Sequence, residues 1–170
     1  AAAAKNIPIR IGVNAGSLEK GLLDKCGGDL PKAMVESAKR HVEILNRFDF
    51  DNIVLSMKSS NVAATVKAYR LASQTFDYPL HLGVTEAGTI KQGIVKSSVG
   101  IGSLLVDGIG DTIRVSLTDD PILEVSAAKS ILRALDLDEN YIEVVSCPTC
   151  ARTKIDLISI ANAVNDAVEG

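Results

Sequence analysis

The chain has 170 residues, a formal net charge of −3 and an aromatic content of 4%. This length allows one good hydrophobic core, and the weak negative charge argues against bulk binding to nucleic acid or to an anionic membrane. The scarcity of aromatic rings also argues against a stacking platform for single strands. Apolar residues make up 46% of the chain, yet no apolar run approaches the roughly 18 residues of a membrane span. We therefore expect a globular protein that binds neither nucleic acid nor membrane.

Strands and helices are predicted to alternate along the chain. Five apolar runs predict β-strands, at 7–14, 52–58, 79–85, 111–117 and 141–147. A helical pattern follows each of these runs, and the five patterns lie at 31–47, 60–75, 91–106, 121–135 and 153–168. Such alternation is typical of βα units and hence of a parallel sheet.

The strands alternate between large apolar residues and small or polar ones. In the first, Ile9, Ile11 and Val13 alternate with Arg10 and Asn14, and the next three strands show the same pattern. A doubly wound sheet buries both faces and would give continuous apolar runs. One apolar face under helices and one polar face is instead the pattern of a (β/α) barrel with a site inside its carboxyl end.

Three cations share the polar face. Arg10, Lys58 and Arg114 are predicted to point toward one cavity, with Glu86 as the only strand-end acid among them. Burying unpaired charge is costly, so the cluster is expected to meet an anion such as a diphosphate. Neutral hydrogen-bonding groups are available nearby, at Asn14, Ser17 and Ser116. The alternative is that the arginines pair with acids elsewhere or lie outside the barrel.

A C-x-x-C motif follows the last predicted strand. The β-branched run 142–145 leads to Cys147 and Cys150, which we expect at a strand end. This spacing suits one metal, one iron–sulfur cluster or a redox disulfide. Three cysteines fit metal ligation in a reducing cytoplasm better than a disulfide framework. Cys26 is expected to be a free thiol, and His81 a satisfied core histidine.

Five motifs together carry a family resemblance. They are Arg10–Leu18 (RIGVNAGSL), Ser56–Ser59 (SMKS), His81–Gly88 (HLGVTEAG), Gly108–Leu117 (GIGDTIRVSL) and Cys147–Arg152 (CPTCAR). In this order they closely resemble the 4-hydroxy-3-methylbut-2-enyl diphosphate synthase family of the methylerythritol phosphate route to isoprenoids.

The resemblance implies a TIM-type (β/α)8 barrel followed by a [4Fe-4S] domain. This chain would hold the C-terminal half of the barrel at 1–140 and the entry to the cluster domain at 141–170. The implied reaction is the reductive ring opening and dehydroxylation of 2-C-methyl-D-erythritol 2,4-cyclodiphosphate. Ferredoxin or flavodoxin would donate the electrons, and the enzyme would be a cytoplasmic homodimer.

Residue roles also follow from the resemblance. Glu86 is implied as the acid beside the reacting carbon, and Cys147 and Cys150 as two cluster ligands. The implied substrate contacts are Arg10, Asn14, Lys58, Arg114 and Ser116. The early barrel strands and the other ligands would lie outside this sequence, so the chain alone is expected to be inactive. The open alternatives are another phosphate-substrate barrel enzyme with a structural C-x-x-C site and a non-catalytic zinc module.

Overall fold

The computed structural model describes residues 1–148 and 150–169. Contacts divide the chain into two units, Ala1–Leu137 and Asp138–Gly170, and each is described by itself. The first unit holds four strands and five α-helices among the described residues, and the second holds one helix, α6. None of the helices in the described part of the chain has the length and apolar character needed to cross a bilayer.

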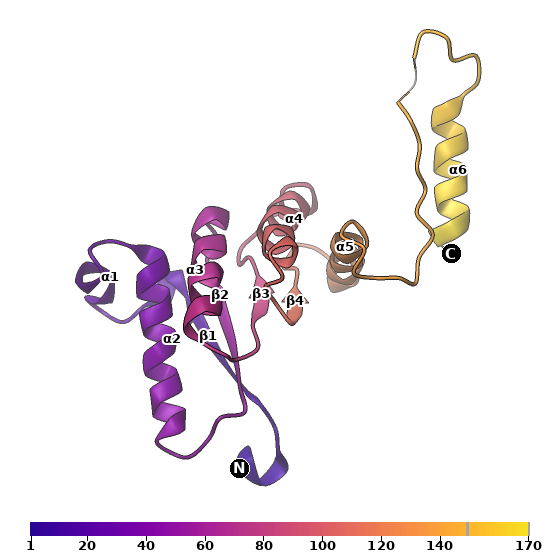
Figure 1. Ribbon diagram of the computed structural model, residues 1–170. Helices are drawn as coiled ribbons and strands as arrows, with labels where there is room; N and C mark the ends of the chain where they lie inside the picture. Colours follow the sequence, from indigo (N-terminus) through magenta and orange to yellow (C-terminus); the bar gives the residue numbers. More distant parts are fainter. Residues whose placement is uncertain (149, 170) are drawn as a thin grey trace. The chain divides into compact units, whose positions relative to one another are not determined.

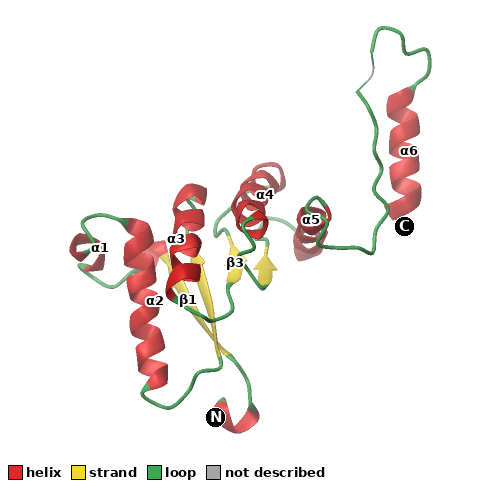
Figure 2. Ribbon diagram, viewed as in Figure 1, coloured by secondary structure: helices red, strands yellow, loops and turns green. Residues whose placement is uncertain are grey.

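The first unit alternates strands with helices (Figures 1 and 2). Its strands are β1 (Ile9–Asn14), β2 (Ile53–Lys58), β3 (His81–Gly83) and β4 (Thr112–Arg114). Its α-helices are α1 (Leu22–Lys25), α2 (Leu30–Asn46), α3 (Val62–Thr75), α4 (Ile90–Val106) and α5 (Pro121–Arg133). Short 3-10 turns lie at Ala3–Lys5 and Ala15–Ser17. The order confirms the predicted α/β class.

The longer helices begin where the sequence supplies a cap. The Asp29 carboxylate accepts from the Lys32 N–H at the start of α2, and the Asn61 side chain accepts from the Ala64 N–H at the start of α3. Such caps satisfy backbone donors that have no partner within the helix. They help fix where each helix leaves the carboxyl end of its strand.

All strand pairs are parallel. β1 pairs with β2 with Ile9 opposite Ile53 and Asn14 opposite Lys58. β3 pairs with β4 with His81 opposite Thr112 and with Gly83 opposite Arg114. Between β2 and β3 only one bridge remains, at Leu55 and Leu80. The four strands therefore form one wall in which the middle seam is loosely joined.

The apolar face of this wall packs against the helices. Ile11, Val13, Leu55 and Met57 lie in one buried cluster, with Leu55 and Met57 fully buried. The cluster also contains side chains of four covering helices, among them Met34 and Val42 of α2, Val66 and Tyr69 of α3, Ile101 and Leu104 of α4, and Ala127 and Ile131 of α5. In β1 the residues between the buried ones, including Arg10 and Asn14, are exposed. The predicted two-faced alternation is confirmed in β1, whereas in β2 Ser56 is buried as well and all three residues of β3 are buried.

The third and fourth strands are shorter than predicted. β3 covers three residues of the expected 79–85 and β4 three of the expected 111–117. After Gly83, and again after Arg114, the backbone leaves the strand and leads to the next helix. Glu86 and Gly88 then have φ angles of 52° and 104°, and an extended strand cannot continue through left-handed backbone.

The predicted fifth strand at 141–147 is wrong. These residues form no strand, and Ile142 and Val145 are 66% and 84% exposed. β-branched residues favour a pleated surface only where neighbours pack on it, and no such neighbour strand lies in the described part of the chain. Cys147 and Cys150 therefore lie in a loop and not at a strand end. The helix that follows, α6 (Leu157–Glu169), begins four residues later than expected.

Candidate functional site

The polar face of the strand wall collects the candidate residues. Arg10 and Asn14 project from β1, Lys58 from β2 and Arg114 from β4. In the parallel ladders Asn14 lies opposite Lys58, and Gly83 lies opposite Arg114. Lys58 and Arg114 thus end β2 and β4, at the carboxyl ends where barrel enzymes build their sites, whereas Arg10 lies near the amino end of β1, opposite Val54.

Lys58 is the most enclosed of the three cations. Its side chain is half-buried, whereas Arg10 and Arg114 are exposed. Burial lowers the pKa of Lys58, and the nearby charges of Arg114 and Arg10 lower it further. The like-charge effect means that the three cations lie close enough to repel one another. An anion between them would remove that repulsion.

These cations have no acidic partner among the described residues. The ion pairs in that part of the chain join Lys32 to Asp29, Arg40 to Glu36 and Arg70 to Asp107, all away from the polar face. Arg114 makes only a long contact, from Nη2 to Ser116 Oγ at 3.4 Å. The arrangement is a cluster of cations without neutralising acids among the described residues, and such clusters of arginine and lysine suit anions.

His81 lies within the same group, contrary to its predicted role as a satisfied core residue. Its Nδ1 is 2.8 Å from Thr112 Oγ1, but its buried Nε2 has no partner among the described residues. Burial lowers the pKa of His81 to about 4, with further lowering from Arg10, Lys58 and Arg114. The imidazole is therefore neutral near pH 7.

A hollow adjoins His81 on the polar face. Its volume is about 430 Å³, and its lining consists of Pro8, Arg10, Val54, His81 and Thr112. In the strand register Arg10 and Val54 lie four residues before Asn14 and Lys58, toward the amino-terminal end of the strands. The polar face therefore offers both cationic groups and space beside them.

Gly83 gives the lysine room to lie across β3. A methyl group at Gly83 would be 3.6 Å from Lys58 Cε and 3.0 Å from the Arg114 carbonyl oxygen. The Lys58 side chain therefore passes over the bare backbone of Gly83 toward β4. An alanine at this position would press on the Arg114 carbonyl in the β3–β4 ladder and would make ordinary contact with Lys58.

Asn14 has a local role as well as the predicted one. Its Oδ1 accepts from the Gly16 N–H at 3.0 Å and so caps the turn Ala15–Ser17. Its carbonyl oxygen is 3.4 Å from the Ser17 hydroxyl. Capping through Oδ1 fixes the carboxamide and directs its NH₂ group away from the turn, where that group can donate to an acceptor.

Glu86 lies in the loop that leaves β3. It is exposed, and its φ of 52° places it in the left-handed region. The chain turns sharply at Ala87–Gly88, where Ala87 is fully buried and Gly88 has a φ of 104°. The Gly88 carbonyl accepts from the Thr118 N–H, which ties this loop to the one after β4. Glu86 thus lies at the site's end of the wall, and its catalytic role stays a prediction.

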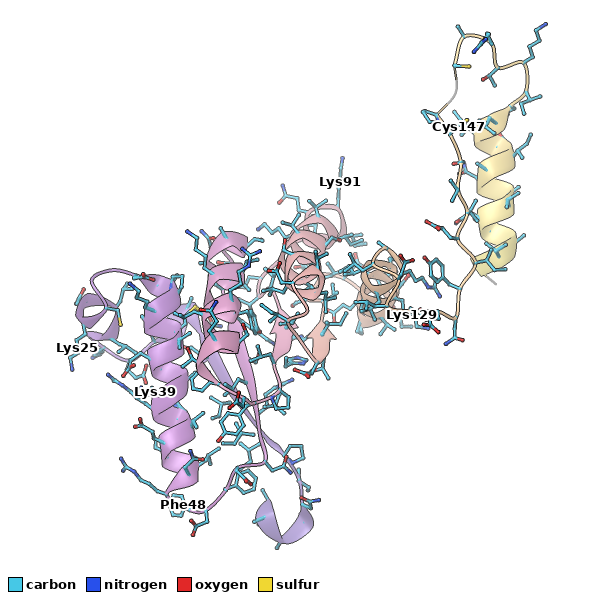
Figure 3. The ribbon with its side chains drawn as sticks, viewed as in Figure 1. Lys25, Lys39, Phe48, Lys91, Lys129 and Cys147 are labelled. Carbon is cyan, nitrogen blue, oxygen red and sulfur yellow. The ribbon has the colours of Figure 1, made fainter. Side chains whose placement is uncertain are left out.

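The second unit carries the cysteine pair on the segment that precedes α6 (Figure 3). Cys147 and Cys150 are both exposed free thiols. A hydrogen bond from the Arg152 backbone and another from Thr153 lower the pKa of Cys150. Thiolates of this kind suit soft metals and iron–sulfur clusters. No set of three or more His, Cys, Asp or Glu converges in the described residues, so the pair fits as part of a ligand set.

Comparison with known proteins identifies the family. The model of the GcpE TIM-barrel domain matches residues 1–129, well over half of the chain. This chain belongs to the GcpE family. The first unit therefore corresponds to part of a TIM-barrel domain, although the strands among the described residues do not close a barrel.

Curated relatives of the GcpE chain share a single name. A protein of Fusobacterium nucleatum is 60% identical over 98% of this chain and 47% of its own length. One of Clostridium tetani is 62% identical over 98% and 48%, and one of Maridesulfovibrio salexigens is 56% identical over 100% and 48%. Each is called 4-hydroxy-3-methylbut-2-en-1-yl diphosphate synthase (flavodoxin). The chain spans about half the length of the curated relatives it matches.

Three contributors to the site were missed from the sequence. His81, Thr112 and Gly83 all lie on the polar face of the GcpE wall. The strand alternation that places Lys58 on the polar face also places His81 and Gly83 there, so the same argument could have included both residues in the candidate site. The contact between His81 and Thr112 depends on the β3–β4 register, which parity alone does not fix.

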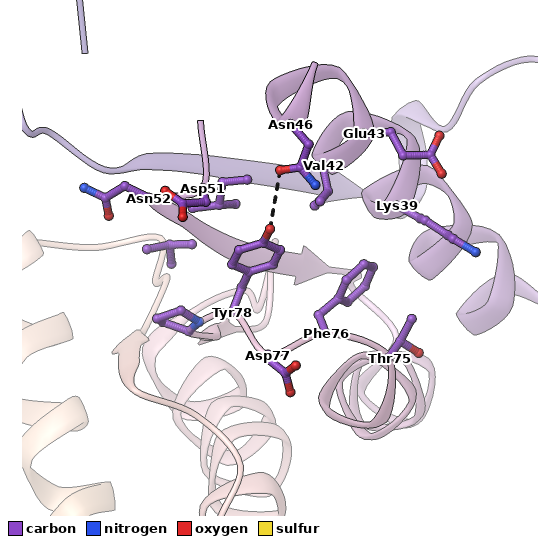
Figure 4. A pocket seen from close by; sticks show the side chains of 13 residues that line it. Lys39, Val42, Glu43, Asn46, Asp51, Asn52, Thr75, Phe76, Asp77 and Tyr78 are labelled. Atoms are coloured by element: carbon purple, nitrogen blue, oxygen red, sulfur yellow. Dashed lines mark hydrogen bonds between the residues drawn. The ribbon is translucent and has the colours of Figure 1, made fainter. Parts of the chain in front are cut away.

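A second hollow lies at the amino-terminal end of the strands (Figure 4). Its volume is about 790 Å³, and it opens between the end of α2, the start of β2 and the end of α3. Tyr78 crosses it with its hydroxyl 3.5 Å from Asn46 Oδ1. The amino-terminal face of a barrel usually serves stability and not catalysis, so we assign no site to it.

Proposed function

We propose that the full-length parent of this chain is a reductase of 2-C-methyl-D-erythritol 2,4-cyclodiphosphate that yields 4-hydroxy-3-methylbut-2-enyl diphosphate. One observation carries the proposal. Arg10, Lys58 and Arg114 repel one another on the barrel's polar face with no acidic partner among the described residues. A diphosphate supplies the missing negative charge, and the relatives' name specifies a diphosphate product.

The polar face would hold the substrate by its phosphates. Arginine offers two parallel N–H donors to a phosphate, and lysine offers a compact charge. The Asn14 NH₂ group and the Ser116 hydroxyl would add neutral hydrogen bonds from β1 and from the end of β4. Together these groups would orient the ring so that its reacting C–O bond faces the mouth of the barrel.

The cysteine pair would contribute two ligands to a [4Fe-4S] cluster. When bound, such a cluster supplies electrons one at a time to a substrate placed beside it. Cys150 is prepared for ligation because its hydrogen bonds favour the thiolate. The remaining ligands would come from the part of the parent that this chain does not contain.

Glu86 would handle the proton at the reacting end. The reaction breaks two C–O bonds, one in the ring and one to the hydroxyl, and forms one C=C bond; it consumes two electrons and two protons, of which one goes to the released phosphate oxygen and one to the hydroxyl, which leaves as water. A carboxyl group at the carboxyl end of β3 lies at the correct end of the wall to protonate that hydroxyl.

The electron donor and assembly form part of the proposal. The relatives' name specifies flavodoxin, and ferredoxin is the alternative one-electron donor. We place the parent in the cytoplasm as a homodimer, where a reducing environment keeps Cys147 and Cys150 available for ligation.

The test is an assay of the reconstituted full-length parent. With the cyclic diphosphate and reduced flavodoxin, the wild-type enzyme should release 4-hydroxy-3-methylbut-2-enyl diphosphate. Cys147→Ser should lose iron, sulfide and activity together, while Cys26→Ser, whose thiol lies in the first unit, should keep all three. A wild-type enzyme that binds iron and sulfide but never converts this substrate would refute the proposal.

A further inference from the structure

The seam between β2 and β3 contains a tyrosine hydroxyl in place of a ladder hydrogen bond. At the lower end of the seam the strands pair directly, since the Leu55 N–H donates to the Pro79 carbonyl at 2.9 Å. Two residues further along, a parallel ladder would join the Met57 N–H to the His81 carbonyl. Instead, the Met57 N–H donates to Tyr69 Oη at 3.0 Å, and Tyr69 Oη donates to the His81 carbonyl at 2.5 Å.

Tyr69 is held firmly in this position. It projects from α3 and is fully buried. Burial raises the pKa of Tyr69 to about 12, so its hydroxyl keeps the proton that it donates to His81. Two hydrogen bonds in series span more distance than one, so the strands separate toward their carboxyl ends. This accounts for the division of the wall into two pairs, β1–β2 and β3–β4.

The opening lies directly beneath the candidate anion site. Lys58 follows Met57 on β2, and Gly83 lies two residues beyond His81 on β3. The Lys58 side chain crosses the opened seam and passes over Gly83, with Cε 3.6 Å from the place that a Cβ would occupy. The seam's width therefore fixes how far Lys58 of one strand pair lies from Arg114 of the other.

We propose that Tyr69 is a positioning residue that sets the spacing of the phosphate-binding cations by holding β2 and β3 apart. The proposal rests on the proposed function and deepens it, because it names the device that adjusts the site to a diphosphate. Without the hydroxyl, Met57 N–H and His81 C=O would be left buried and unpaired. They could recover a partner only by closing the seam onto one another.

The test compares two tyrosine variants in the full-length parent. Tyr69→Phe keeps the packed ring and removes only the bridging hydroxyl. Displacing a positioned group by about 1 Å can cost as much as ~100-fold, so we expect KM for the cyclic diphosphate and Ki for inorganic diphosphate to rise about tenfold. The kcat should stay within about twofold and the iron content should be unchanged. Tyr78→Phe, whose hydroxyl meets Asn46 at the other end of the strands, should change none of these.

The outcomes separate this inference from the proposed function. A lower Tm for Tyr69→Phe with unchanged KM and Ki would mean that the residue is merely structural, and would overturn the inference. A crystal structure of the wild-type parent gives a check that requires no variant. Tyr69 Oη between Met57 N and His81 O supports the inference, and a direct Met57–His81 hydrogen bond overturns it. Failure of the wild-type enzyme to convert the cyclic diphosphate would instead refute the proposed function.

Discussion

Gly83→Ala offers a test of how closely the polar face is built. The added methyl group would meet the Arg114 carbonyl oxygen at 3.0 Å and Lys58 Cε at 3.6 Å. Overpacking of this kind costs about 1–3 kcal/mol, and alanine recovers about 0.5–1 kcal/mol because it restricts the unfolded chain more than glycine does. The free energy of unfolding should therefore fall by about 1 kcal/mol net.

The same methyl group should weaken anion binding. A hydrogen bond from a charged donor contributes about 1.5–3 kcal/mol, and the shift of the Arg114 backbone that the methyl group requires should forfeit about 1 kcal/mol of it. The Kd for inorganic diphosphate should rise about fivefold. We would measure it by calorimetric titration of the full-length parent, with thermal unfolding alongside. Gly12→Ala is the matched control, since a methyl group there meets nothing within 4 Å. Unchanged affinity and unchanged Tm for Gly83→Ala would refute the close packing of Gly83 against the Arg114 backbone.

Three further predictions follow from the charges of the site. Folding lowers the pKa of His81 from 6.5 to about 4, so between these pH values the unfolded chain binds a proton that the folded chain does not. The free energy of unfolding should therefore be highest above about pH 6.5 and should fall as the pH drops toward 4. In His81→Asn the free energy of unfolding, measured with urea at each pH, should depend less on pH in this range. Parallel pH profiles for the two proteins would contradict the prediction. Lys58→Met should weaken inorganic diphosphate binding by about tenfold or more, whereas Lys39→Met on α2 should leave it unchanged; equal effects would deny Lys58 a specific role. Thr153 helps to lower the pKa of Cys150, so Cys150 should react with iodoacetamide at pH 7 faster in the wild-type protein than in Thr153→Val. Thr153→Ser keeps the hydroxyl and should restore the wild-type rate. Identical rates for all three proteins would exclude an effect of this contact.

Strand parity predicted much of the site because it depends only on local geometry. Side chains alternate across a strand, so the apolar residues of β1 identified the helix-covered face and assigned Arg10 and Asn14 to the other. Helix limits were also accessible, since Asp29 and Asn61 act as caps immediately before the helical periodicity begins.

Features that depend on contacts between distant segments were not accessible. The Tyr69 hydroxyl reaches two strands that flank its own helix, and nothing in the local sequence distinguishes it from an ordinary core tyrosine. The prediction of a strand at 141–147 was wrong for the complementary reason. Its β-branched residues satisfy the local preference for a strand, yet a strand forms only where a partner strand is present.

The most direct test of the account is a crystal structure of the full-length parent with the cyclic diphosphate bound. The account predicts phosphate oxygens within hydrogen-bonding distance of Arg10, Lys58 and Arg114. It also predicts that none of the three pairs with a carboxylate from another strand. A substrate bound elsewhere, with these cations neutralised by acidic side chains of the barrel, would contradict the account.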